Sequence, residues 1–230
     1  MAPSVLPHFK QSSRARGNRT HGDAATRLRQ AILDGLFQPN ERLIEEDLAE
    51  QFKTKRPAIR AALALLEQER LIVHERNKGA RVRLVTPEEA DEILECRAVL
   101  EALAARKAAR RIDESGVARL RAIIAEMERH ESAPNLRAYS ECNGRFHQAI
   151  SEVANHPTSA RLLVLLKSQS VRYQYRSVLN PGRPTKSLRE HKAIFQALSR
   201  HDPDAAEAAM RSHIDNVRDA VRDGAANLLP

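Results

Sequence analysis

The sequence predicts a mainly α-helical chain in which a winged helix-turn-helix domain precedes an all-α, antiparallel six-helix bundle. Two observations predict this fold. Residues 43–83 read as helix, turn, helix and two short strands, which is the order of a winged helix-turn-helix. After residue 86, apolar residues recur at helical spacing, and only short breaks interrupt them. We therefore expect a flexible basic arm over 1–22, a winged domain over 23–86 and a helical domain over 87–230.

Helical spacing and capping residues place three short helices in the winged domain. Asp23 is a suitable N-cap for the first helix, and the Pro-containing turn at 38–40 ends it. The second helix is expected from Glu45 to Phe52. The third begins near Pro57, which suits the first turn of a helix because the missing N–H is not needed there.

Two strands joined by a tight turn complete the predicted winged domain. Residues 71–73 and 80–84 have strand character. The turn between them is Asn77-Lys78-Gly79, in which Gly79 can adopt a positive φ. This hairpin is the expected wing.

The remainder of the chain is predicted to be entirely helical. Thr86 is an N-cap followed by Pro87 and two acidic residues, a typical helix start. The short connections favour antiparallel neighbours. The expected helices span 87–110, 113–131, 135–154, 157–178, 185–200 and 203–226.

Composition favours a nucleic-acid partner and disfavours several other classes of protein. Residues 1–86 carry 16 Lys/Arg and 10 Asp/Glu, a net charge of +6, whereas the remainder has a net charge of +2. Five Phe, three Tyr and no Trp do not suit a base-stacking platform for single strands. Cys96 and Cys142 form no CxxC motif, and there is neither a bilayer-length apolar run nor a signal-peptide pattern. We therefore expect a cytoplasmic protein without a membrane partner.

The start of the third helix is the expected reader of duplex DNA. Arg56 and Arg60 are four residues apart and share a face, beside Lys55. A recognition helix enters the major groove by this end, where Arg can bind guanine O6 and N7. The alternative is an ordinary solvated basic face. Further contacts, with the DNA backbone or minor groove, are expected from Arg76, Lys78 and Gly79 in the wing.

Four residues of the helical domain have the spacing of a metal site. His191 and His213 each lie about eleven residues from the break near Asp202, so they are level in an antiparallel helix pair, about 16 Å from the turn. Asn143 and His147 are i,i+4 on another helix. If that face also turns inward, three imidazoles and one amide meet in the core, and imidazole suits Zn, Ni, Cu or Fe. The alternative is a set of unrelated histidines.

Motifs in both halves resemble those of a known family. LIEEDLAEQF, RPAIRAALALLEQERLI and NKGARV resemble the N-terminal domain of GntR-type bacterial transcription regulators. RFHQAI, REHKAIFQAL and AAMRSHI resemble the effector domain of the FCD, or fatty-acid-regulator, branch of that family. Lys55, Pro57 and Ala61 depart from the family's recognition-helix pattern, so the operator sequence is not carried over.

The resemblance implies site residues in the helical domain. In the FCD domain, an Asp four residues before the first His joins three His in holding a divalent metal, and Asn143 stands at the Asp position. Zn or Ni is expected, with the ligands Asn143, His147, His191 and His213. Arg97, and more loosely Arg172, match positions that face the effector cavity, where Arg can pair with a carboxylate. The alternative for Arg97 is an ion pair with Glu101.

Together these observations predict a transcription regulator, by default a repressor, that binds a pseudo-palindromic operator as a homodimer and senses a small organic or sugar acid. Two alternatives stay open. A metal-dependent enzyme could use the three-histidine centre, although it would leave the winged domain unexplained and Asn143 cannot act as a general base. An architectural DNA-binding protein would need no effector.

Overall fold

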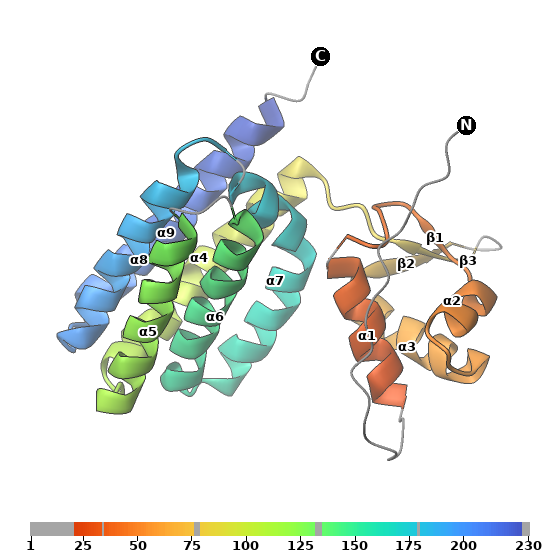
Figure 1. The fold of residues 1–230 in the computed structure, drawn as a ribbon, viewed down its shortest axis with the longest axis horizontal. Coiled ribbons are helices and arrows are strands. Elements are labelled where there is room, and N and C mark those ends of the chain that lie inside the picture. The colour runs from red at the N-terminus through yellow and green to blue at the C-terminus, as the bar shows by residue number, and fades with distance from the viewer. Residues whose placement is uncertain (1–20, 34, 76–78, 132–134, 179, 227–230) are drawn as a thin grey trace.

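The structure is a computed structural model that describes residues 21–33, 35–75, 79–131, 135–178 and 180–226. The chain forms two lobes, one with three helices and a small sheet and the other with six helices (Figure 1). The predicted mainly α fold is confirmed. Residues 1–20 of the expected arm lie outside the described residues, and residues 21–22 belong to the first helix.

The winged part consists of three helices and a three-stranded antiparallel sheet. Its elements are α1 (His21–Leu33), β1 (Arg42–Leu43), α2 (Glu45–Gln51), α3 (Arg56–Gln68), β2 (Ile72–Glu75) and β3 (Gly79–Val82). The strand order is β1-β3-β2, with Arg42 opposite Arg81 and Ile72 opposite Val82. Strand β1 was not predicted. The prediction of Asp23 as N-cap is wrong, because α1 begins two residues earlier and includes Asp23 in its first turn.

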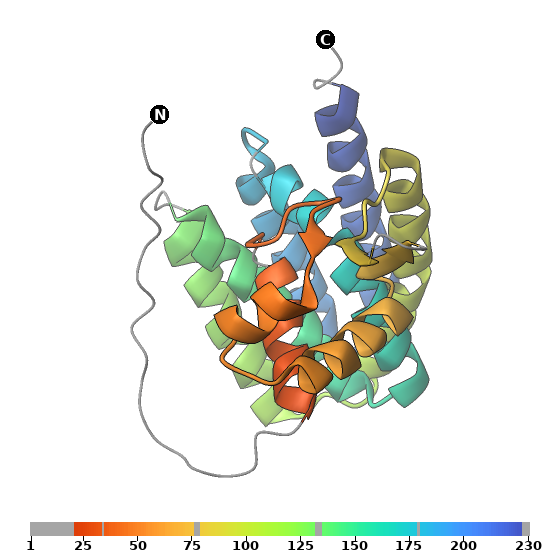
Figure 2. The ribbon, with the colours of Figure 1, turned by 90° about the vertical axis from the view of Figure 1, so that its right-hand side faces the viewer.

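A compact apolar core holds the winged part together. Leu28 of α1 and Ile59, Leu66 of α3 are fully buried, and Ile72 brings the sheet onto them. Each such side chain contributes about 1.5–3 kcal/mol when it leaves water. This core holds α3 against the rest of the winged part, which faces the viewer in Figure 2.

The helical part confirms the predicted six-helix bundle. Its helices are α4 (Pro87–Ala109), α5 (Glu114–Glu131), α6 (Leu136–Ala154), α7 (Pro157–Val178), α8 (Arg183–Ser199) and α9 (Pro203–Ala226), within two residues of expectation at every boundary. Thr86 caps α4, since its side chain accepts a hydrogen bond from Glu89 N at 3.2 Å. None of the described helices has the length and apolar character needed to cross a membrane.

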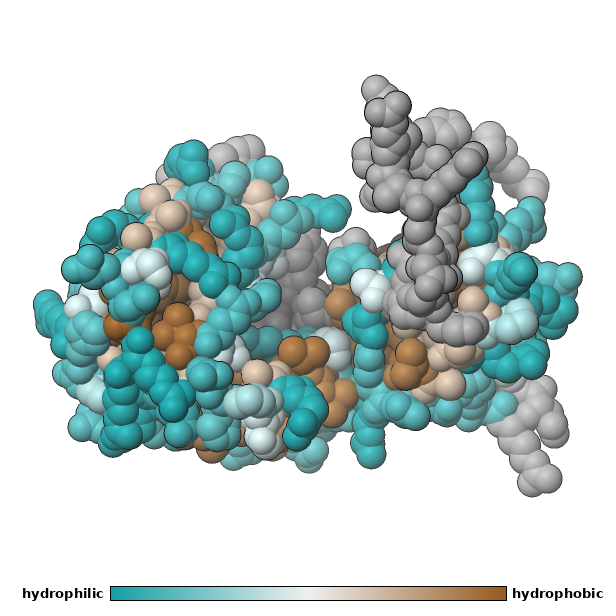
Figure 3. All heavy atoms as spheres, turned by 90° about the horizontal axis from the view of Figure 1, so that it is seen from below, coloured by the Kyte–Doolittle hydropathy of each residue, from teal (hydrophilic) through white to brown (hydrophobic). Residues whose placement is uncertain are grey.

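Helix α4 is the centre of the bundle and packs along α9. Its small residues Ala102, Ala105 and Ala109 are fully buried and let neighbouring helices approach closely. Seen from below, hydrophilic side chains cover much of both lobes and apolar ones form separate islands (Figure 3). Cys96 is exposed and Cys142 is buried, and both are free thiols.

Candidate functional site

The N-terminal end of α3 presents two exposed arginines. The side chains of Arg56 and Arg60 are 57% and 69% exposed, and Lys55 occupies the N-cap position. Glu45, at the start of α2, binds Arg60 through two hydrogen bonds of 2.9 and 2.8 Å. The hydrogen bond from Arg60 keeps the pKa of Glu45 below its usual value. Both arginines are therefore exposed at the helix N-terminus, and Glu45 holds Arg60 in one orientation through its Nε and Nη2.

The predicted wing is described only in part. Gly79 opens β3 with φ of +80°, the positive value expected for the turn, and no atom lies where a Cβ would point. Arg76 and Lys78 lie outside the described residues.

Three histidines from three helices meet inside the bundle. His147 of α6, His191 of α8 and His213 of α9 are 5%, 0% and 1% exposed. Nε2 of His147 lies 3.3 Å from Nε2 of His191, and the ring centroids of His191 and His213 are 4.4 Å apart. His191 and His213 lie level, as the spacing predicted, and the face of α6 that carries His147, whose orientation the spacing left open, turns inward.

A second group of residues holds the opposite edge of each imidazole ring. Nδ1 of His213 lies 2.7 Å from Oε2 of Glu190, and Nδ1 of His191 lies 3.4 Å from the Ser187 hydroxyl. Nδ1 of His147 lies 2.6 Å from Oε2 of Glu101, close but not aligned as a linear hydrogen bond. With each Nδ1 facing an outer partner, the Nε2 atoms are left to face one another.

Burial keeps these imidazoles neutral. Desolvation lowers the pKa of His147 to about 4, against the opposing attraction of Glu101. Desolvation also lowers the pKa of His191 and of His213 below the ordinary value of 6.5. A neutral ring with its Nε2 lone pair turned inward is the form that binds a metal.

The donor set therefore fits a divalent transition metal. The possible ligand atoms of His147, His191 and His213 all lie within 4.8 Å of one another. Imidazoles oriented by carboxylate and hydroxyl groups are typical of metal sites. Asn143 lies one helical turn before His147 and is partly exposed, so its part as a fourth ligand remains a prediction.

Glu101 connects the histidines to two cations, the buried Arg97 of α4 and the partly exposed Lys167 of α7. Oε1 of Glu101 accepts from Arg97 at 3.0 and 2.7 Å, and Oε2 lies 3.2 Å from Nζ of Lys167. Burial alone would raise the pKa of Glu101, but Lys167 and Arg97 hold it well below its usual range. Arg97 also donates to the Ser170 hydroxyl at 3.2 Å.

Two expected effector residues have different outcomes. Arg97 is 1% exposed and makes the ion pair with Glu101 that was its alternative role. Arg172 lies on α7, but its side chain is outside the described residues. Sequence reasoning missed Glu101, Glu190 and Ser187 as partners of the histidines. Ser187 carried a signal, because it lies four residues before His191 on the same helix face.

Helix α7 links this cluster to the winged part. Lys167 and Ser170 contact Glu101 and Arg97, whereas the Gln169 amide donates to the Glu69 carbonyl at 3.4 Å. One turn further on, the Tyr173 hydroxyl donates to the Val85 carbonyl at 2.7 Å. One helix thus contacts both the buried site and the winged part.

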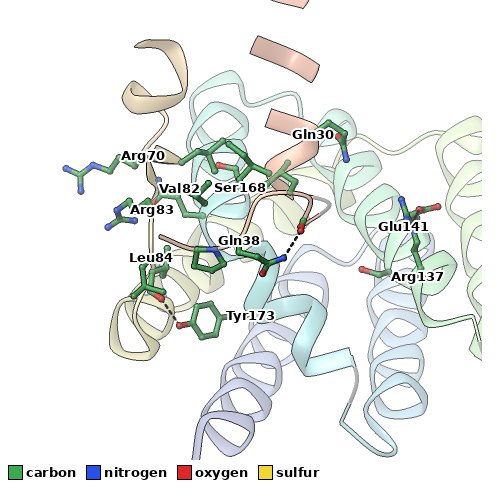
Figure 4. A pocket seen from close by; sticks show the side chains of 18 residues that line it. Gln30, Gln38, Arg70, Val82, Arg83, Leu84, Arg137, Glu141, Ser168 and Tyr173 are labelled. Atoms are coloured by element: carbon green, nitrogen blue, oxygen red, sulfur yellow. Dashed lines mark hydrogen bonds and ion pairs between the residues drawn. The ribbon is translucent and has the colours of Figure 1, made fainter. Parts of the chain in front are cut away.

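A cleft of about 770 Å³ separates the two parts beside α7 (Figure 4). Arg70 and Arg83 line it from the winged part, and Arg137 and Tyr173 line it from the bundle. The three histidines do not line it. Its size would change with any movement of one part relative to the other.

The chain matches two protein-family models. Residues 20–82 match the model described as bacterial regulatory proteins, gntR family, and residues 92–216 match the FCD domain. The HTH-type transcriptional repressor RspR of Escherichia coli is 28% identical over 195 residues, which cover 85% of this chain and 86% of that protein. The galactonate operon transcriptional repressor of E. coli is 29% identical over 199 residues, which cover 77% of this chain and 86% of that protein.

Solved structures share the fold. E. coli McbR/YncC superposes with a TM-score of 0.77 at 19% identity, and a GntR regulator from Rhodococcus sp. RHA1 superposes with 0.72 at 24% identity. Each comparison covers 88% of this chain and 97% of the other.

Proposed function

This chain belongs to the FCD branch of the gntR family and is a DNA-binding transcription regulator, and on that premise we propose that it is a repressor controlled by a small carboxylate bound at a metal-containing site. The observation that carries the proposal is the buried three-histidine cluster, with each Nδ1 held from outside. His147, His191 and His213 would hold Zn or Ni, with Asn143 as the expected fourth ligand. The bound metal would supply a Lewis-acidic partner for an effector oxygen.

The DNA-binding half of the proposal rests on α3. Arg56 and Arg60 are exposed at the helix N-terminus, where a recognition helix meets base edges. We propose base contacts for these two arginines and backbone contacts for Lys55, Arg76, Lys78 and Gly79. Two copies of the chain would place two such helices on the half-sites of a pseudo-palindromic operator.

The link between the halves rests on α7. Residues Lys167 and Ser170 contact the charged cluster beside the histidines, while Gln169 and Tyr173 hydrogen-bond the winged part. An effector that changes the Arg97–Glu101 ion pair would therefore change the position of α7 and the affinity for DNA.

The names of two relatives support the proposals that this regulator is a repressor and that its effector is an acid. Two relatives carry the name repressor, and one of them is named for the galactonate operon. Galactonate is a sugar acid, in agreement with a carboxylate effector for this chain. Arg97 and Arg172 remain proposed effector contacts.

The enzyme alternative has less support. Glu101 and Glu190 lie beside the histidines, but both are bound to cations and their pKa values lie below the usual range. Such carboxylates are held ionised as hydrogen-bond acceptors and do not suit proton donation at neutral pH. The regulators of this family also account for the winged part, which an enzyme would not use.

Metal content and effector response test the sensing half. We expect protein purified without a His-tag to carry Zn or Ni in elemental analysis, and His191→Ala to lose it. Some member of a carboxylate library should raise the melting temperature and release operator DNA. A metal-free wild type, or a library without any effect on operator binding, would contradict the proposal.

Base reading tests the DNA-binding half. Arg60→Ala should lower the preference for operator over unrelated DNA by about 10- to 100-fold, because a bidentate Arg–guanine contact is worth roughly 1–3 kcal/mol. Arg189→Ala, an exposed charge deletion on α8, serves as the control. If Arg60→Ala kept the sequence preference of wild type, Arg60 on α3 would not be a base-reading residue.

A further inference from the structure

Glu45, the first residue of α2, binds one edge of the Arg60 guanidinium on α3. Its Oε1 accepts from Nε of Arg60 at 2.9 Å, and its Oε2 accepts from Nη2 at 2.8 Å. The side chain of Glu45 is 26% exposed, whereas that of Arg60 is 69% exposed. Two parallel hydrogen bonds fix both the direction and the plane of a guanidinium, which a single bond would not do.

The other edge of the same guanidinium is left for a partner. Glu45 occupies the N–H of Nε and one N–H of Nη2, so the fork between Nη1 and Nη2 keeps its donors. Among the described residues, no acceptor other than Glu45 contacts Arg60. This fork is the shape that pairs with O6 and N7 of guanine. The carboxylate therefore holds Arg60 by the edge that base reading does not need.

Glu45 also lies beside the second arginine of the helix start. Its Oε2 is 4.0 Å from Nη2 of Arg56, whose side chain is 57% exposed. The hydrogen bond from Arg60, and to a lesser extent the charge of Arg56, keep the pKa of Glu45 below its usual value, so the carboxylate is ionised at neutral pH. It cancels one positive charge and repels phosphates at the place where α3 would meet DNA.

We propose that Glu45 is a positioning residue for base recognition, which directs the Nη1–Nη2 fork of Arg60 toward a guanine and weakens binding to DNA of unrelated sequence. The inference rests on the proposed base contact of Arg60 and adds to it a residue outside the recognition helix. An arginine that is already held in one direction loses less side-chain freedom on binding. Sequence preference then arises both from a favoured correct contact and from a disfavoured phosphate contact.

The test measures sequence preference in the full-length protein. Wild type first enriches a duplex from a random-sequence pool, and fluorescence anisotropy then gives the ratio of its affinities for that duplex and for an unrelated duplex of equal length. Glu45→Gln keeps the shape of the side chain but removes its charge and one acceptor. We expect its preference to fall about three- to tenfold, a part of the roughly 10- to 100-fold expected from Arg60 itself. Its affinity for the unrelated duplex should stay equal or rise.

Two further variants separate orientation from charge. Glu45→Asp keeps the charge but is too short to reach both N–H groups, so it should lose preference without gaining affinity for the unrelated duplex. Glu46→Gln is the matched control, because it makes the same charge change at the exposed neighbouring position. It should change the affinity for both duplexes by the same factor and keep the preference of wild type.

A double-mutant cycle excludes a merely structural role. In the Arg60→Ala background, Glu45→Gln should not reduce the preference further, because the group that it positions is gone. A loss of folding would instead lower the affinity for both duplexes in either background, and circular dichroism of each variant detects it.

Three results would overturn the inference. They are wild-type preference in folded Glu45→Gln, an equal loss of affinity for both duplexes, and an equal gain for both, which would mean that Arg60 leaves Glu45 to bind phosphate. Failure of the base contact itself is distinguishable. In that case Arg60→Ala would keep the preference of wild type, whereas an unchanged Glu45→Gln beside an impaired Arg60→Ala overturns only the role of Glu45.

Discussion

A single carboxylate, Glu101, organises the buried charge at the centre of the helical part. It is 2% exposed and contacts Arg97, Lys167 and His147. An isolated carboxylate would not remain ionised there, since burial raises its pKa, and the surrounding cations reverse that effect. Its charge in turn orients the His147 ring.

Replacing Glu101 should weaken metal binding without removing a ligand. We expect Glu101→Gln to raise the dissociation constant for zinc by about 10- to 100-fold, as is usual when the outer partner of a ligating imidazole is lost. Competition with a chromophoric chelator measures this constant. Glu92→Gln, an exposed position on the same helix, is the control. Equal zinc affinity in folded Glu101→Gln and wild type would show that His147 does not need this carboxylate.

Sequence reasoning could predict the histidines but not their partners. His191 and His213 were found because helical rise and a short turn fix which residues are level. Glu101 and Arg183 could not be separated from surface charges, because Glu and Arg are exposed in most proteins and burial is decided by the packing of several helices. For Arg97, the i,i+4 spacing to Glu101 gave the ion pair as the alternative to an effector contact, and the structure contains that ion pair.

At the scale of elements, the α4–α9 pair carries a defined ion-pair network. Asp91 of α4 binds Arg218 at 2.6 and 2.7 Å and also binds Arg222 of α9. These contacts, together with the buried alanines of α4, bring the two longest helices together. The hydrogen bonds from Arg218 and Arg222 lower the pKa of Asp91 well below the ordinary 3.8.

This network predicts a pH-dependent contribution to stability. Asp91→Asn should lower the free energy of unfolding by about 1 kcal/mol at pH 7, the scale of a partly exposed, well-formed ion pair. A carboxyl group whose pKa is depressed by folding stabilises above its unfolded pKa and loses this effect as pH falls. The difference between Asp91→Asn and wild type should therefore shrink progressively below about pH 4.

Urea denaturation at pH 7, 5 and 3.5 measures that difference. Asp223→Asn, at an exposed position of the same helix α9, is the matched control. A constant difference from pH 7 to pH 3.5 would mean that Asp91 acts through packing and not through its charge.

Helix α7 is the element through which the two parts should communicate. Tyr173→Phe removes the 2.7 Å hydrogen bond to the Val85 carbonyl and keeps the ring. We expect effector binding to be preserved while the effector-induced change in operator affinity falls several-fold, about 1 kcal/mol of coupling. Fluorescence anisotropy with labelled operator, with and without effector, measures both quantities. Ser168→Ala, which removes a hydroxyl that donates to the Leu165 carbonyl within α7, controls for loss of a hydroxyl from this helix. If effector changed the operator affinity of Tyr173→Phe as much as that of wild type, contacts other than this hydrogen bond would couple the two parts.

Helices were predictable to the extent that local signals mark their ends. Thr86 and Asn135 cap α4 and α6 through their own side chains, which sequence identifies directly. Strand β1 has only two residues and forms by pairing with the edge of β3, so no local sequence pattern predicts it. Asp23 looked like a cap because of its residue type, yet the helix continues before it.

At the scale of the whole molecule, the winged part and the helical part are packed separately and few contacts join them. Each has its own apolar core, and residues 1–86 carry a net charge of +6, of which residues 1–22 supply +4. The contacts between them in the described residues include the Arg83–Glu89 ion pair and two side-chain hydrogen bonds from α7, and a cleft lies beside that helix. Such a sparse connection allows the parts to change their relative position at low cost.

The charge distribution predicts a steep salt dependence of DNA binding. Two winged parts in a homodimer would together neutralise about 8–10 phosphates, so the logarithm of the operator association constant should fall against the logarithm of salt concentration with a slope of about −7 to −9. Lys55→Ala, which removes an expected phosphate contact from each copy, should make the slope less steep by about 2. Arg60→Ala should lose affinity for operator more than for unrelated DNA, because its expected contact is with a base. Anisotropy titrations at several KCl concentrations from about 50 to 300 mM measure the slopes of wild type, Lys55→Ala and Arg60→Ala. A wild-type slope shallower than about −4 would indicate that one winged part, and not two, binds the operator.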